Sequence, residues 1–184
     1  MILDVGASTG YVSREIDSRL AYDAKWVLLD KSNAALRFAK GVSGSNLDAT
    51  YKVSTFVEYS PASMFDAIIF SFTMLEIADT HETLVHALHL LSLHGVVIVV
   101  LPDCLSDVIQ YSRNIASYTP LQEFVDADLN LPKVDPFTGE SYPFSAKRVT
   151  RFLSEAMSSG LAMIELFRDG EGGRGVFVVV FERI

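Results

Sequence analysis

Cysteine is nearly absent from this sequence, since Cys104 is the only one among 184 residues. A single cysteine cannot close an internal disulfide, and it leaves no second thiolate for a structural zinc site. This excludes a disulfide-stapled scaffold and favours the reducing cytoplasm as the location of the protein.

Basic residues are also scarce. The chain has 15 Lys and Arg against 23 Asp and Glu, which gives a formal net charge of -8, and the basic residues are scattered along it. A surface that follows nucleic-acid phosphates needs clustered positive charge. We therefore expect no nucleic-acid partner.

Long apolar runs are missing too. No run reaches the length of a membrane span, and the N-terminus lacks the basic segment and long apolar stretch of a signal peptide. We expect no membrane partner. What the sequence does have is 49 % hydrophobic residues, enough for one sizeable core. We predict a single domain over residues 1–184.

Strand-length apolar runs alternate with helical periodicities along the chain. We predict strands over residues 1–5, 25–30, 49–56, 65–72, 96–102, 161–167 and 175–182. We predict helices over residues 11–21, from the cap Ser32 to Gly41, and over 79–93, 105–117 and 145–159. The Pro-rich stretch 119–143 is expected to be irregular. Such alternation indicates an α/β fold with a largely parallel sheet, whose ligands bind at the carboxyl ends of the strands.

A glycine-rich turn, Gly6-Ala7-Ser8-Thr9-Gly10, follows the first predicted strand. The G-x-G-x-x-G spacing of dinucleotide-binding proteins is absent, and no G-K-[ST] follows as in a P-loop. Asp30 stands 20 residues after Gly10, at the end of the second predicted strand, where a carboxylate can accept both ribose hydroxyls. Turn and acid together indicate a cofactor that contains adenosine.

Four segments in order carry a resemblance to a known family. Leu3-Asp4-Val5-Gly6-Ala7-Ser8-Thr9-Gly10 resembles the first motif of class I S-adenosylmethionine-dependent methyltransferases, with Ser8 in place of the central glycine. Asp30 matches the second motif, residues 65–75 match the fourth strand and the segment after it, and residues 90–98 match the helix, glycine and fifth strand. The resemblance implies a three-layer sandwich with a seven-stranded sheet of order 3-2-1-4-5-7-6 and an antiparallel last strand.

The resemblance also implies a cofactor, S-adenosylmethionine, with S-adenosylhomocysteine as product, and a small-molecule acceptor. Asp4 would orient the first loop and Asp30 would bind the ribose. The remaining residues implied at the donor are Gly6, Ala7, Ser8, Gly10, Lys31, Thr55, Phe56, Phe72 and Thr73. Lys31 and Phe56 would flank the adenine, and the backbone of Phe72 and Thr73 would face the methionine amine. The acid that the family offers after its third strand is replaced here by Ser54-Thr55-Phe56.

The acceptor site is less sharply marked. Glu76 is the best placed side chain for a general base, with an ordinary early-helix carboxylate as the alternative. Tyr11, Tyr111 and Tyr142 are candidates for the acceptor pocket, with simple packing as the alternative. Because the chain starts inside the first strand, without the helices that usually precede it in this family, we expect weakened cofactor retention.

No metal site is predicted. His81 and His86 are five residues apart, whereas H-E-x-x-H requires four, so they lie about 140° apart on a helix. His86 and His89 share a face but have no third ligand.

Two alternatives to an active methyltransferase stay open. One is a methyltransferase-like binding or assembly module without turnover, which the substituted glycine and the missing acid both favour. The other is a short-chain-type NAD(P) dehydrogenase, whose opening turn resembles Gly6 to Gly10. Its catalytic Tyr-x-x-x-Lys is absent, because Tyr142 and Lys147 are five residues apart.

Overall fold

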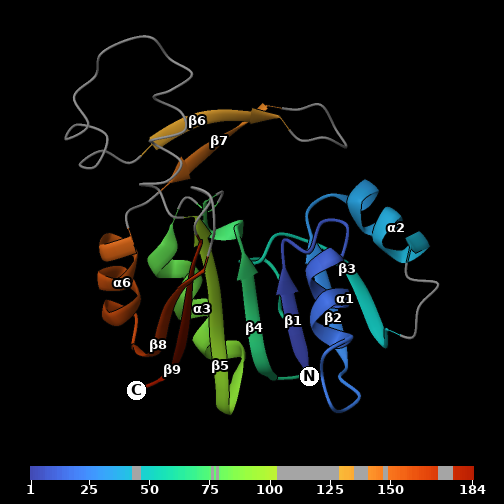
Figure 1. Cartoon of the computed structure of the whole chain (residues 1–184), viewed down its shortest axis with the longest axis horizontal. Helices are drawn as coiled ribbons and strands as arrows, with labels where there is room; N and C mark the ends of the chain where they lie inside the picture. Colours follow the sequence, from blue (N-terminus) through green and yellow to red (C-terminus); the bar gives the residue numbers. More distant parts are fainter. Residues whose placement is uncertain are drawn as a thin grey trace.

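The structure is a computed structural model of the chain, and it describes residues 1–42, 47–75, 77, 79–102, 129–134, 141–146, 149–169 and 176–184. Its main sheet has seven strands in the order β3-β2-β1-β4-β5-β9-β8 (Figure 1). These strands are β1 (Ile2–Val5), β2 (Trp26–Asp30), β3 (Ala49–Val53), β4 (Phe65–Ser71), β5 (Leu91–Pro102), β8 (Leu161–Asp169) and β9 (Val176–Arg183).

The first five strands are parallel to one another, and β9 runs antiparallel between β5 and β8. Since β8 and β9 are the sixth and seventh strands of this sheet along the chain, its order is 3-2-1-4-5-7-6. The predicted sheet order and its antiparallel last strand are confirmed.

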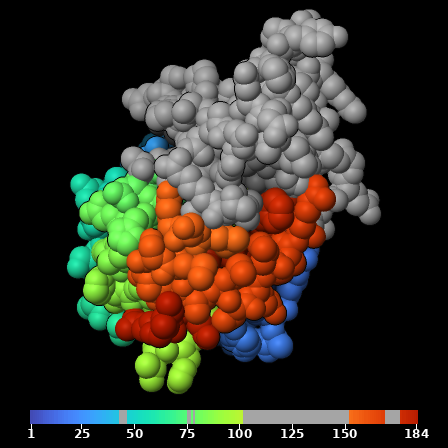
Figure 2. Space-filling view, turned by 90° about the vertical axis from the view of Figure 1, so that its left-hand side faces the viewer, coloured from blue at the N-terminus to red at the C-terminus, as the bar shows by residue number. Residues whose placement is uncertain are grey.

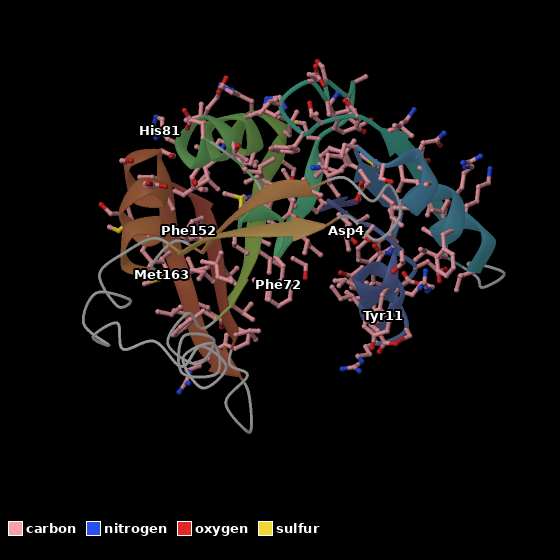
Figure 3. The ribbon with its side chains drawn as sticks, turned by 90° about the horizontal axis from the view of Figure 1, so that it is seen from above. Asp4, Tyr11, Phe72, His81, Phe152 and Met163 are labelled. Carbon is pink, nitrogen blue, oxygen red and sulfur yellow. The ribbon has the colours of Figure 1, made fainter. Side chains whose placement is uncertain are left out.

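Helices cover both faces of the sheet (Figure 3). Alternate residues of β1 face opposite sides, so Ile2 joins a core with α1 (Tyr11–Asp17) and α2 (Asn33–Val42), and Leu3 joins a core with α3 (Thr80–Leu90) and α6 (Val149–Ser158). The larger core, on the side of α3 and α6, holds Phe65, Phe70, Phe152 and Phe181. These layers confirm the three-layer sandwich.

Local capping explains where two of the helices begin. The Ser32 hydroxyl accepts a hydrogen bond from the amide of Ala35 at 3.2 Å, as predicted for the start of α2. Asp79 caps α3 by accepting from the amide of Glu82 at 2.8 Å. Gly41 does not end α2, which continues to Val42.

The end of α3 differs from the prediction. The helix stops at Leu90, and residues 91–93 belong to β5 instead. Leu91 pairs with Phe65 of β4, and a Cβ on Gly95 would lie 2.7 Å from the Phe65 carbonyl oxygen. This tight junction against β4 ends the helix earlier than its apolar periodicity suggests.

A hairpin replaces part of the stretch expected to be irregular. Strands β6 (Leu129–Val134) and β7 (Ser141–Ala146) pair antiparallel, with Pro132 opposite Pro143. Proline disfavours a central strand, but both strands of a two-stranded sheet are edges, so the hairpin tolerates both prolines. The hairpin lies above the carboxyl ends of the main sheet (Figure 1). Strand β7 contacts the short helix η1 (Thr73–Leu75) after β4.

The last predicted helix also starts later, because β7 takes residues 145 and 146 and α6 begins at Val149. The helix predicted over residues 105–117 lies outside the described residues. Figure 2 looks onto α6, β8 and β9, which form this end of the molecule. Strand β8 is the edge of the sheet and exposes Met163 and Leu166.

None of the helices in the described part of the chain is long and apolar enough to cross a membrane.

Candidate functional site

The predicted donor residues come from the carboxyl ends of neighbouring strands. Asp4 and the turn from Gly6 to Gly10 belong to the end of β1, Asp30 ends β2, and Phe72 and Thr73 follow β4. Strands β2, β1 and β4 are adjacent in the sheet, so the fold brings these segments together. Binding sites of open α/β sheets lie at this edge.

The turn after β1 has a left-handed backbone at three residues. Gly6, Ser8 and Gly10 have φ of 69°, 48° and 68°. Ser8 therefore carries a side chain in a conformation that favours glycine. The amides of Gly6 and Ala7 both donate to the Leu29 carbonyl oxygen, at 2.8 and 3.0 Å, so the turn is tied to β2.

Gly6 permits a close approach between two loops of the site. A Cβ on Gly6 would lie 2.4 Å from Oγ1 of Thr73. The Thr73 hydroxyl in turn donates to the Val5 carbonyl oxygen at 2.7 Å. The segments after β1 and β4 are thus packed against each other without room for a side chain, which sequence reasoning about Thr73 did not foresee.

Asp30 is held by backbone donors on both oxygens. Its Oδ2 accepts from the amide of Ser8 at 2.8 Å, and its Oδ1 accepts from the amide of Ser32 at 2.8 Å. A carboxylate has about four lone-pair sites, so it retains capacity for a ligand hydroxyl on each oxygen. The same side chain therefore fixes the turn and presents a rigid acceptor at the end of β2.

Asp4 is buried beneath the turn, with 1 % of its surface exposed. Its Oδ2 accepts a hydrogen bond from the hydroxyl of Ser13, which is fully buried in α1. Burial raises the pKa of the Asp4 carboxyl from 3.8 to about 6, the bond from Ser13 opposes the rise, and the Asp30 charge adds to it. Ser13 is a partner that the motif reading missed, although it is a small polar residue nine positions after Asp4 on the next helix.

The predicted adenine contacts after β3 differ in exposure. Thr55 is exposed and its hydroxyl donates to Glu58 at 2.5 Å. The ring of Phe56 is buried, with its centroid 5.1 Å from that of Phe70 and 4.9 Å from that of His86. The Phe56 ring is therefore packed within the core, while the Thr55 hydroxyl holds the Glu58 carboxylate in the segment after β3. Lys31 is exposed and follows Asp30.

Two aromatic side chains are exposed on the α1 side of the site (Figure 3). Tyr11 begins α1 and is 62 % exposed. Phe72 is 43 % exposed and has a left-handed backbone, with φ of 61°. Glu76 and Tyr111 lie outside the described residues. Tyr142 lies in β7, but its side chain is outside the described part of the structure.

The described residues contain no group of three or more His, Cys, Asp or Glu side chains able to hold a metal ion. Two of the three helix histidines considered as ligands lie within hydrogen-bond distance of other groups. His81 Nδ1 lies 2.8 Å from the Ser159 hydroxyl, and His86 Nε2 lies 3.0 Å from the Tyr59 carbonyl oxygen.

Comparison with known proteins shows to which family this chain is similar. A family model described as "Methyltransferase domain" matches residues 2–95, just over half of the chain. No curated protein matches.

Solved structures of similar fold include a SAM-dependent methyltransferase from Methanosarcina mazei, with a TM-score of 0.72 and 17 % identity, covering 100 % of this chain and 92 % of that one. A S-adenosylmethionine-dependent methyltransferase from Clostridium acetobutylicum has a TM-score of 0.72 and 11 % identity, over 99 % and 83 % of the two chains. The N-methyltransferase NodS from Bradyrhizobium japonicum has a TM-score of 0.65 and 11 % identity, over 99 % and 84 %.

The sheet order, the turn after β1 and the acid after β2 define a Rossmann-like fold of the methyltransferase type. The chain belongs to the methyltransferase-domain family, within the class I S-adenosylmethionine-dependent methyltransferases. The residues present fit such a donor, because the turn leaves no space behind its glycines and Asp30 is a preformed hydroxyl acceptor.

Proposed function

We propose that this chain transfers the methyl group of S-adenosylmethionine to a small molecule. The observation that carries the proposal is the pair of backbone bonds to Asp30, which fixes a carboxylate beside the glycine turn. A ribose with two free hydroxyls is the ligand that such an acceptor fits. The formal net charge of -8 favours a small acceptor over a nucleic acid.

Each part of the donor would meet a different segment. Asp30 would accept from the ribose hydroxyls, and the turn from Gly6 to Gly10 would lie along the ligand. The exposed backbone of Phe72 and Thr73 would face the methionine amine. At the adenine end we assign the contact to Thr55 and the carboxylate of Glu58, because the Phe56 ring is packed against Phe70 and His86.

The donor supplies a methyl group on a positively charged sulfur, which is a good leaving group. An acceptor lone pair forms the new bond to that carbon, the carbon–sulfur bond breaks with its electron pair staying on sulfur, and the acceptor's proton leaves to solvent. The chain's own contribution is to hold the two reactants in line and exclude water. The hairpin β6–β7, which lies over the carboxyl ends of the sheet, is placed to help with both tasks.

Donor binding to an Asp30→Asn variant tests this proposal. The amide keeps the size of the side chain but loses the charge, and it can accept on only one side. Hydrogen bonds to charged groups contribute about 1.5–3 kcal/mol, so S-adenosylhomocysteine should bind at least about ten-fold more weakly, by calorimetry. Asp23→Asn, a change of an exposed aspartate before β2, serves as the matched control and should bind as the wild type does.

Turnover separates the enzyme from a binding module. Wild-type chain that binds the donor and methylates a member of a small-molecule panel supports the proposal. Donor binding without turnover on a broad panel supports the module, which the strained Ser8 in the turn favours. Binding of NAD(P) in place of the donor would support the dehydrogenase and contradict both.

A further inference from the structure

The ring of Phe72 stands exposed at the carboxyl end of β4, where a bulky residue adopts an unfavourable backbone. Its φ is 61°, and 43 % of its surface is exposed. Left-handed backbone is uncommon for residues with a large side chain, and such positions concentrate at ligand sites. A glycine would meet the backbone requirement without penalty. The ring itself therefore needs an explanation.

The conformation of Phe72 is imposed from both sides. Its amide donates to the Val100 carbonyl oxygen of β5 at 3.0 Å. The next residue, Thr73, is anchored through its hydroxyl to the Val5 carbonyl oxygen of β1. The Phe72 amide is therefore bonded to β5 and the Thr73 side chain to β1, so the chain is anchored both at Phe72 and directly after it.

An uncharged strip of side chains crosses the sheet from Ser71, the residue before Phe72. Ser71 pairs with Val100, Val100 pairs with Val178, and Val178 pairs with Phe167. Directly paired residues project from the same face, and by alternation with Ile69 this is the face that carries α1 and α2. Val100 and Val178 are half-buried and Phe167 is 49 % exposed.

Tyr11 borders the same region from the opposite side. It is 62 % exposed at the start of α1, and in the view along the strands Phe72 lies between Tyr11 and the end of the sheet that carries Met163 (Figure 3). In that view Phe72 therefore lies between Tyr11, the residue after the glycine turn, and the β8 edge of the sheet.

We propose that Phe72 is a specificity-determining residue that stacks on a planar aromatic ring of the methyl acceptor. This inference rests on the proposed function, since it takes the turn beside Phe72 to be the donor site. A saturated acceptor would gain as much from an aliphatic side chain, whereas a planar ring gains additionally from offset stacking on a phenyl face. The four paired side chains of the strip are uncharged, and the carboxylate that follows them along the same face of β8, Glu165, disfavours an anionic ring.

The test compares phenol with cyclohexanol, two probes with the same number of carbon and oxygen atoms that differ in planarity. Their dissociation constants are measured by ligand-observed NMR on the free chain and on the chain saturated with S-adenosylhomocysteine. An aromatic pair contributes about 0.5–1.5 kcal/mol beyond area burial, which predicts that wild type prefers phenol by about two-fold to ten-fold. Phe72→Tyr keeps this preference, and Phe72→Leu brings the ratio to about one.

Matched variants make the result specific to this ring. Phe38→Leu changes a phenylalanine that is 53 % exposed on α2, and it should leave the ratio at the wild-type value. Phe72→Gly, which meets the backbone requirement but has no side chain, should abolish the preference for phenol. Equal affinity of wild type for both probes, or an unchanged ratio in Phe72→Leu, overturns the inference.

Donor calorimetry separates this inference from the proposed function. The donor titration is made on the wild-type chain, and the control Phe38→Leu, on α2, should bind S-adenosylhomocysteine as the wild type does. A wild-type chain that does not bind the donor contradicts the proposed function, whatever the probes show. A chain that binds the donor but shows no preference between the probes contradicts only the role of Phe72.

Discussion

Asp4→Asn should remove a pH dependence of stability that the wild-type chain owes to one buried carboxyl. The folded chain raises the pKa of Asp4 from 3.8 to about 6, chiefly through burial. Between these values the folded state holds a proton that the unfolded state has released. The stability that this group contributes is therefore fully present below about pH 4 and is lost as the pH rises through about 6.

The size of the effect follows from the two pKa values. The interval between 3.8 and about 6 corresponds to about 3 kcal/mol in total, at about 1.36 kcal/mol for each pKa unit. Roughly half of this, about 1.4 kcal/mol, falls between about pH 5 and about pH 7.5. Asp4→Asn should lack this component, and it should gain stability relative to wild type as the pH rises.

Urea unfolding measures the difference. Trp26, the only tryptophan, is 1 % exposed in the core, so its fluorescence reports unfolding. The quantity compared is the change in unfolding free energy between the two pH values, in wild type, in Asp4→Asn and in the exposed control Asp23→Asn. If Asp4→Asn follows the wild-type slope, the buried carboxyl is not the source of the pH dependence. If Asp4→Asn is more stable than wild type but binds the donor more weakly, Asp4 serves donor binding at a cost in stability.

Two further substitutions test the turn after β1. Ser8→Gly should stabilise the chain by about 1 kcal/mol or more in urea unfolding, because it relieves a φ of 48°, and a loss of stability would contradict the strain. Gly6→Ala should destabilise it by about 2 kcal/mol or more, because the new Cβ would lie 2.4 Å from the Thr73 hydroxyl oxygen. A thermal midpoint unchanged from wild type would show that this loop contact is loose.

The sheet could be predicted from sequence because its strands carry strong local signals. Apolar runs such as the one within Phe65–Ser71 indicate strands covered on both faces, and the structure buries Phe65 and Ile68 to Phe70 in the centre of the sheet. The predicted end of α3 was wrong because the helical periodicity of the sequence continues past Leu90. The helix ends there because Leu91 pairs with Phe65 and Gly95 lies close to the Phe65 carbonyl, contacts that the sequence does not reveal. The hairpin was missed because its prolines suggest irregular structure, whereas pairing of two edge strands tolerates them.

The places of the proposed donor residues in the fold could be predicted from the sequence only where a motif fixes a backbone position. The turn, Asp4 and Asp30 follow from small residues and acids at set places after two strands. The burial of the Phe56 ring could not be predicted, because it depends on Phe70 and His86, which are distant in sequence. The backbone of Phe72 likewise depends on distant groups, since its amide bonds to the Val100 carbonyl and the next residue, Thr73, bonds to the Val5 carbonyl.

Calorimetric titration of the chain with S-adenosylhomocysteine tests the central claim most directly. We predict saturable binding at one site per chain, weakened at least about ten-fold in Asp30→Asn and unchanged in Asp23→Asn. Absence of binding, or equal binding by Asp30→Asn and wild type, would contradict the assignment of the donor site to the turn after β1 and Asp30.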